Sequence, residues 1–124
     1  MSKQKLIVWG REFELDVIIG CYSGEEILPF QKEALKEFLS CENLIDNSLD
    51  KVKAYCVNRN EEEIDGIVEN IFKYVIPRSL YVQRNPNSEH VVGLICAYKF
   101  DPEHGLVVVF KNEQFYAIGG EGII

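Results

Sequence analysis

Residues 90–111 read His90-Val-Val-Gly-Leu-Ile-Cys-Ala-Tyr-Lys-Phe-Asp-Pro-Glu-His-Gly-Leu-Val-Val-Val-Phe-Lys111. Two runs in this stretch, 90–100 and 106–111, are rich in the β-branched and aromatic residues that favour strands. Alternate residues of a strand point to opposite faces. In the first run both faces are apolar, with Val92, Leu94, Cys96 and Tyr98 on one and Val91, Ile95 and Ala97 on the other. The sequence therefore predicts two strands, the first of them covered on both sides.

Further strands are predicted on both sides of this stretch. Residues 80–83 come before it and Phe115–Ile118 after it, each separated from it by a short polar turn. At the N-terminus, Lys5–Trp9 and Phe13–Ile19 are strand-like, and Gly10-Arg11 between them suits a tight reversal. Strands joined by short turns pair in antiparallel fashion. The expected sheet is thus antiparallel, an N-terminal hairpin plus a C-terminal meander.

About three helices are predicted in the middle of the chain. The first runs from Pro29, a residue suited to the first helical position, to about Cys41. Ser48 is expected to cap a second, with an apolar inner face. A third is expected to begin at the acidic triplet 61–63 and to be stopped by Pro77. Grouped helices and grouped strands indicate an α+β fold, in one domain that covers residues 1–124.

Composition and charge narrow the classes of function. No stretch approaches the roughly 18 consecutive apolar residues of a membrane span, and no secretion signal precedes the four cysteines, which form no CxxC pair. We therefore expect a cytoplasmic protein with reduced thiols. The formal charge of −7 repels nucleic acid and anionic membranes. The acidic residues either keep the protein soluble or complement a protein partner with a basic surface.

The densest polar cluster is the loop 101–105, in which Asp101, Glu103 and His104 are candidate binding residues. Two carboxylates and an imidazole can share a metal ion or a proton. Turn chemistry explains the same residues: Asp accepts backbone hydrogen bonds, Pro fixes φ, and Gly supplies positive φ. We favour the turn, which predicts a positive φ at Gly105 and an Asp101 side chain that accepts backbone N–H groups.

Established catalytic, metal and cofactor motifs are missing from the sequence. It contains no GxSxG, HExxH, CxxC or glycine-rich phosphate loop. A nucleophilic pair of Cys96 with His90 or His104 is conceivable, but burial in an apolar strand would raise the pKa of that thiol and make it inert. We assign no catalytic residue, no metal site and no cofactor.

The run Ala97–Asn112, followed by Tyr116-Ala-Ile-Gly119, resembles the C-terminal signature of a family of small uncharacterised bacterial proteins. In that signature an aromatic residue and Asp-x-Glu-His-Gly-Leu precede a strand, an Asn-containing turn and a final strand. The segment Pro77-Arg-Ser-Leu-Tyr81 also resembles theirs. The resemblance implies an α+β domain of bacterial origin without an established activity, and some members of the family are thought to occur near toxin–immunity loci.

Three hypotheses of function follow. The first is a non-enzymatic protein-binding module, for example an immunity-type protein whose acidic face covers a basic enzyme. The second is a small hydrolase or metal-dependent enzyme that uses Asp101, Glu103 and His104. The third is a homo-oligomer in which the last strand, Phe115–Ile118, pairs edge to edge with a copy.

Overall fold

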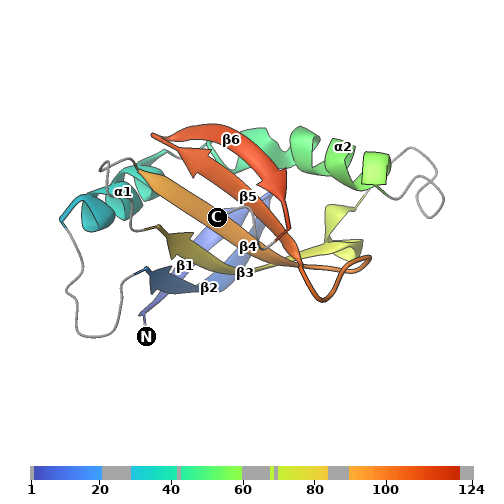
Figure 1. Cartoon of the computed structure of the whole chain (residues 1–124), viewed down its shortest axis with the longest axis horizontal. Coiled ribbons are helices and arrows are strands. Elements are labelled where there is room, and N and C mark those ends of the chain that lie inside the picture. Colours follow the sequence, from blue (N-terminus) through green and yellow to red (C-terminus); the bar gives the residue numbers. More distant parts are fainter. Residues whose placement is uncertain are drawn as a thin grey trace.

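The computed structural model describes residues 2–20, 29–41, 43–59, 68, 70–83 and 90–120, which form a mixed sheet and two α-helices. Their order along the chain confirms the predicted α+β class (Figure 1). The elements are β1 (Ser2–Val8), β2 (Arg11–Ile19), α1 (Pro29–Ser40), α2 (Leu49–Arg59), β3 (Val75–Val82), β4 (Val91–Tyr98), β5 (Leu106–Lys111) and β6 (Gln114–Gly119), with short 3-10 turns η1 (Asp46–Ser48) and η2 (Ile71–Lys73).

The six strands form one sheet in the order β1-β2-β3-β4-β5-β6. Four of the five pairings are antiparallel, but β2 and β3 run parallel, from Asp16 opposite Ser79 to Ile19 opposite Val82. The expectation of a purely antiparallel sheet was therefore wrong. Parallel neighbours need a long crossover connection, and here the chain leaves the end of β2, forms both helices and returns to the start of β3.

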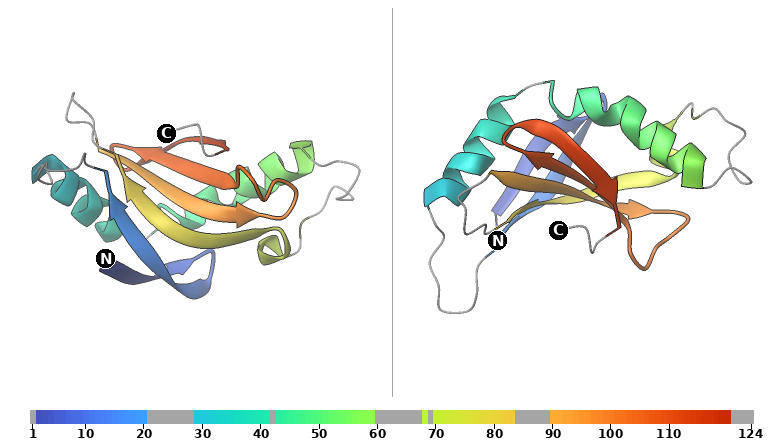
Figure 2. Two further views of the ribbon diagram at one scale, coloured as in Figure 1. Left: turned by 60° about the horizontal axis from the view of Figure 1, so that its bottom comes forward. Right: turned by 45° about the horizontal axis from the view of Figure 1, so that its top comes forward.

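Both helices lie on one face of the sheet (Figures 1 and 2). The predicted first helix is confirmed as α1, whose Ala34 and Phe38 are buried, and the predicted second helix as α2, whose Val52 and Cys56 are buried. These side chains pack on the inner face of the sheet in one hydrophobic core. A polar residue, Gln31, is fully buried with them, and its Nε2 donates a hydrogen bond of 2.5 Å to the carbonyl oxygen of Gly20.

The N-terminal hairpin is confirmed, with its turn one residue earlier than predicted. Val8 pairs with Arg11, so Trp9 and Gly10 form the turn, at φ of 51° and 86°. Two positive φ values match the right-handed twist of the strands. Trp9 is buried in this unusual conformation, where its Nε1 donates to the carbonyl oxygen of Ile45 at 3.1 Å and to Ser48 Oγ at 3.3 Å. The indole thereby joins the hairpin to the connection between the helices.

The predicted third helix is wrong in its second half. Residues 71–73 form only a 3-10 turn, in which Asn70 Oδ1 accepts from the backbone N–H of Phe72, and Val75 already begins β3. Pro77 lies inside this strand instead of ending a helix. It is tolerated because β2 pairs only from Ser79 onward and the ladder with β4 shifts register after Pro77, where an extra residue bulges. The expected helix start at 61–63 lies outside the described residues.

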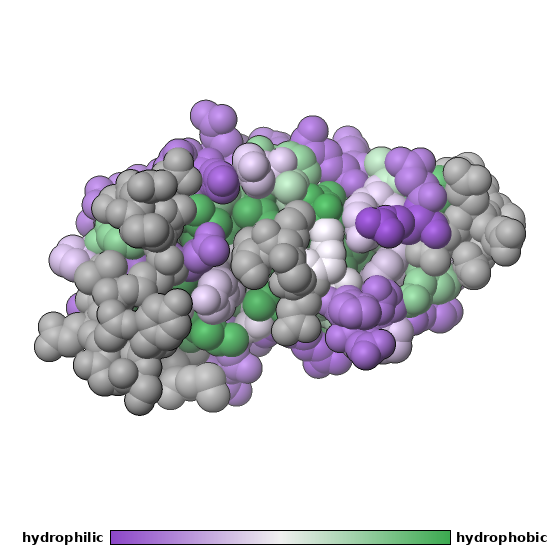
Figure 3. All heavy atoms as spheres, in the orientation of Figure 1, coloured by the Kyte–Doolittle hydropathy of each residue, from purple (hydrophilic) through white to green (hydrophobic). Residues whose placement is uncertain are grey.

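The opposite face of the sheet is also apolar. Val91, Val107 and Val109 are almost fully buried there and form a second, smaller cluster with Ile95. This confirms that β4 is covered on both sides. In the view of Figure 3, hydrophobic side chains gather over the middle of the molecule and hydrophilic ones surround them. Within the described ranges, no helix is long and apolar enough to span a membrane.

Candidate functional site

The Asp101–Gly105 loop joins β4 to β5 and is held by its own backbone. The amide of Asp101 donates to the carbonyl oxygen of Tyr98 at 3.2 Å, and the amide of Gly105 donates to the carbonyl oxygen of Asp101 at 2.8 Å. The backbone N–H of His104 donates to Asp101 Oδ1 at 3.2 Å, and φ of Gly105 is 66°. Both features that the turn interpretation predicted, the positive φ and the side-chain acceptor, are therefore confirmed.

The structure brings two of the three predicted site residues together. His104 Nδ1 lies 3.1 Å from Asp101 Oδ1, and the two side chains are 61% and 45% exposed. Glu103 is exposed beside them in the same loop. Hydrogen bonds from the His104 ring and then from the His104 backbone hold the pKa of Asp101 below its ordinary value. The contact fixes the orientation of the imidazole ring relative to the carboxylate.

We expect the stabilisation from this carboxylate to depend on pH. Because the pKa of Asp101 is lower in the folded chain, the ionised group stabilises the fold above its unfolded-state pKa, and that effect is lost as pH falls through the folded-state pKa. Urea melts should show that wild type exceeds Asp101→Asn in stability at neutral pH, and that this difference is smaller at about pH 3, below the unfolded-state pKa of about 3.9. In a His104→Ala background, the difference in stability between Asp and Asn at position 101 should be smaller at neutral pH. A gap that is the same at both pH values would contradict this prediction.

A second histidine–carboxylate pair lies at the other end of β4. His90 Nδ1 is 3.0 Å from Glu113 Oε2, and these side chains are only 18% and 24% exposed. The backbone of His90 also bonds Asn112: its carbonyl oxygen accepts from the Asn112 amide at 2.8 Å, and its N–H donates to Asn112 Oδ1 at 3.2 Å. Sequence reasoning considered His90 only as a partner for Cys96. The pair could have been found from the strand register, which places residue 90 beside the β5–β6 turn.

Glu113 makes this contact from a backbone conformation that is unfavourable for a residue with a side chain. Asn112 and Glu113 form the β5–β6 turn with φ of 49° and 60°, a geometry in which Asn-Gly is the preferred pair. We expect Glu113→Ala to lower the free energy of unfolding by about 1 kcal/mol, because the contact is lost and the strain stays. Glu113→Gly should cost less, because glycine adopts a positive φ freely and the substitution therefore also relieves roughly 1 kcal/mol of backbone strain. Denaturant melts that rank the two variants equally would contradict this account.

The conceivable cysteine nucleophile is buried. Cys96 is 2% exposed, its Sγ lies 3.8 Å from the carbonyl oxygen of Leu94, and burial raises the pKa of its thiol. Both histidines have carboxylate partners, as described above. The expectation that burial would raise the pKa of this thiol is confirmed. In the described part of the chain, no three His, Cys, Asp or Glu side chains form a group suited to a metal ion.

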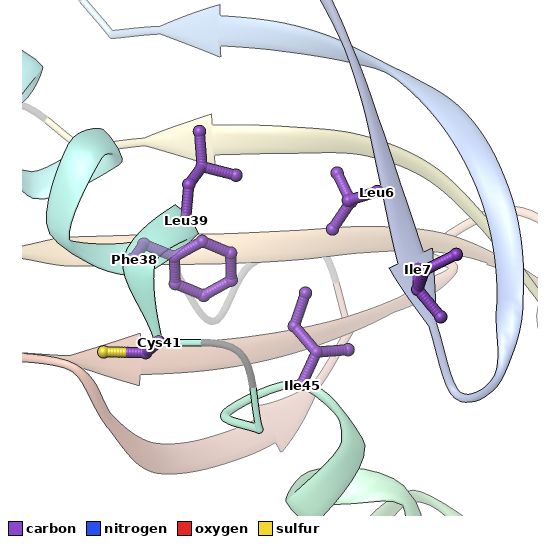
Figure 4. A pocket seen from close by; sticks show the side chains of 6 residues that line it. All are labelled: Leu6, Ile7, Phe38, Leu39, Cys41 and Ile45. Atoms are coloured by element: carbon purple, nitrogen blue, oxygen red, sulfur yellow. The ribbon is translucent and has the colours of Figure 1, made fainter.

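An apolar pocket of about 320 Å³ lies away from all these polar groups (Figure 4). It is between β1 and the C-terminal end of α1, and it is lined by Leu6, Ile7, Phe38, Leu39, Cys41 and Ile45. Sequence reasoning missed this pocket, because its walls come from segments more than thirty residues apart, and each residue looks like an ordinary member of a hydrophobic pattern.

A protein-family model described as "Domain of unknown function (DUF6985)" matches residues 2–124. This agrees with the expectation of a family whose activity is not established. No curated protein and no solved structure matches the chain.

Proposed function

Since the chain belongs to the DUF6985 family, a domain of unknown function, we propose that this protein is a non-enzymatic protein-binding module. The observation that carries the proposal is the position of β1. It is the first strand of the sheet, with β2 on one side, and the apolar pocket lies beside it. An edge strand presents unpaired backbone groups that can pair with another chain. Apolar pockets beside such edges give binding its specificity.

The net charge supports a partner with a basic surface, as in an immunity-type protein that covers a basic enzyme. Of the 13 basic side chains 12 lie in the described ranges, whereas of the 20 acidic side chains only 10 do, a local balance of 12 − 10 = +2. The acidic excess therefore belongs to the segments between and after those ranges. Long-range attraction by these segments would speed the encounter with a basic protein.

Affinity purification from the native host tests this proposal. Tagged protein should recover one stoichiometric partner at low salt, and recovery should fall as salt screens the charges. A triple variant with Gln in place of the acidic residues 61–63 serves as the charge control and should recover less. If no stoichiometric partner is recovered at low salt, the protein-binding proposal fails. A partner that is recovered equally at high salt and by the triple variant would leave binding intact but contradict its basic character.

A further inference from the structure

We propose that the open edge of β1 and the apolar pocket beside it form a docking groove for one extended segment of a partner protein. The segment would add to the sheet as a strand, place acidic side chains opposite Lys3 and Lys5, and insert an apolar side chain into the pocket. This inference rests on the proposed protein-binding function and specifies how the partner is held: its basic surface would face the acidic segments of this chain, while one acidic strand of it would occupy the groove.

The pocket opens at the edge of β1 and not on one of its faces. Two consecutive residues of β1, Leu6 and Ile7, line it together with the end of α1 and Ile45. None of the described residues that line the pocket comes from β2, so the pocket lies on the side of β1 away from its hairpin partner. In the close-up the turn at the end of β1 leads into β2 on the side away from the pocket, while Leu6, Leu39, Phe38 and Ile45 surround the gap (Figure 4).

The backbone groups of β1 that do not bond β2 face this gap. In an antiparallel hairpin with a two-residue turn, the residues that flank the turn form a hydrogen-bonded pair, and such pairs alternate along the ladder. Val8 and Arg11 flank the turn here, so the even-numbered residues of β1 bond β2. The N–H and C=O groups of Lys3, Lys5 and Ile7 therefore point to the other side, where no strand of the described part of the chain pairs with them. The Lys5 carbonyl oxygen accepts a hydrogen bond of 3.1 Å from Gln4 Nε2, which an added strand would displace.

The charges along this edge favour an acidic strand. Lys3 and Lys5 lie on the outer face of β1, opposite Asp16 and Glu14 of β2, and Lys3 Nζ is 3.8 Å from Glu14 Oε1. A strand on the open side would lie about 5 Å from the lysines and about 10 Å from the β2 carboxylates. At physiological salt the Debye length is about 8 Å, so the attraction to the lysines outweighs the repulsion. The preferred partner segment therefore has acidic residues on the outer face, and these alternate with apolar residues on the pocket side.

The same charges disfavour a second copy of this chain as the occupant. In the antiparallel register that pairs the whole of β1 with its copy, Lys5 would lie opposite Lys5, and like charges directly opposite each other are destabilising. The size of the pocket favours a side chain over a separate small molecule. At about 320 Å³ it lies at the bottom of the range of small-molecule sites, which is roughly 300–1,000 Å³.

Selection from a displayed library of random linear peptides tests the groove. Wild type should enrich peptides in which acidic and apolar residues alternate, and a synthetic copy of the winner should bind in fluorescence anisotropy. Enrichment of peptides without this alternation, or no enrichment, would overturn the inference. Elution of the protein as a dimer that pairs through the β1 strands of two copies would also overturn the inference.

Two substitutions at one position separate the backbone from the charge. Lys5→Pro removes an outward N–H but no bond to β2, whereas Lys5→Thr removes the charge and keeps the N–H. The winning peptide should bind Lys5→Pro about tenfold more weakly than Lys5→Thr, as the loss of one hydrogen bond of about 1.4 kcal/mol implies. Binding to Lys5→Thr should depend less on salt than binding to wild type. Equal affinities of the two variants would contradict strand addition.

The thiol of Cys41 gives a readout that needs no change in β1. Cys41 lines the pocket and is partly exposed, whereas Cys56 and Cys96 are buried. In a Cys21→Ser background, the peptide should slow alkylation of Cys41, and prior alkylation with a bulky maleimide should weaken peptide binding. Unchanged alkylation in the presence of saturating peptide would place the peptide elsewhere.

The outcome for the native partner distinguishes this inference from the broader proposal. If the partner recovered from the host binds Lys5→Pro and Cys41-alkylated protein as well as wild type, the protein is a binding module that uses another surface. If no partner is recovered at all, the proposed function fails first.

Discussion

Gly105→Ala should lower the free energy of unfolding by about 2 kcal/mol or more. Gly105 has a φ of 66°, a conformation that side chains with a Cβ adopt only at a cost. A Cβ at this position would also lie 2.7 Å from the carbonyl oxygen of Cys96, a backbone atom of the central strand β4 that cannot move aside. Denaturant melts measure the sum of the two effects.

Gly10→Ala is the matched control for this prediction. Gly10 also has a positive φ, 86°, but a Cβ there would meet nothing within 4 Å. Its substitution should therefore cost only the conformational part, about 1 kcal/mol. The difference between the two variants isolates the clash with Cys96. If Gly105→Ala melted like Gly10→Ala or like wild type, the close approach of the loop to β4 would be wrong.

Phe110→Ala should have the largest effect of the substitutions considered, about 3–5 kcal/mol. Phe110 is 1% exposed on β5 and meets the ring of Phe38 edge-on at a centroid distance of 5.1 Å. The substitution leaves a cavity at the contact between the sheet and α1, which neighbouring strands on both sides prevent from collapsing. Urea melts with an unchanged slope would show that stability alone has changed.

Phe115→Ala removes the same side chain from a looser site. Phe115 is only partly buried, lies on the last strand β6, and approaches Phe110 at 6.4 Å. We expect a loss of roughly 1–2 kcal/mol, because an edge strand can move toward the gap. Equal losses for the two variants would contradict the assignment of Phe110 to the centre of the core.

Local patterns in the sequence were sufficient for much of this fold. Strand-like residues predicted β2, a run that is apolar on both faces predicted β4, and Pro29, suited to the first helical position, predicted the start of α1. The parallel pairing of β2 with β3 could not be predicted in this way, because nothing within either segment specifies a neighbour so distant in sequence. Residues 71–77 were predicted as the end of a helix because their apolar spacing suits one. The chain instead uses the β-branched Val75 and Ile76 in a strand.

The candidate sites show the same division between local and long-range information. Asp101 and His104 are three residues apart, so turn chemistry predicted their backbone contacts and the positive φ at Gly105. His90 and Glu113 meet only because the meander folds back on itself. The pocket needs β1 and the end of α1 to come together. A site assembled from ordinary core residues has no signature in the sequence.

The parallel contact between β2 and β3 has a consequence for how the molecule assembles. The link between these strands, residues 20–74, is several times longer than the longest link in the meander, residues 83–90. Closing the longer link costs roughly 2 kcal/mol more in chain entropy. The N-terminal hairpin is therefore the part of the sheet whose docking is entropically most expensive. A partner that touches β1 on one side and α1 on the other binds only the docked hairpin, so by mass action its binding energy adds to the stability of that docking. A partner bound in the groove would therefore keep the hairpin docked on the rest of the sheet.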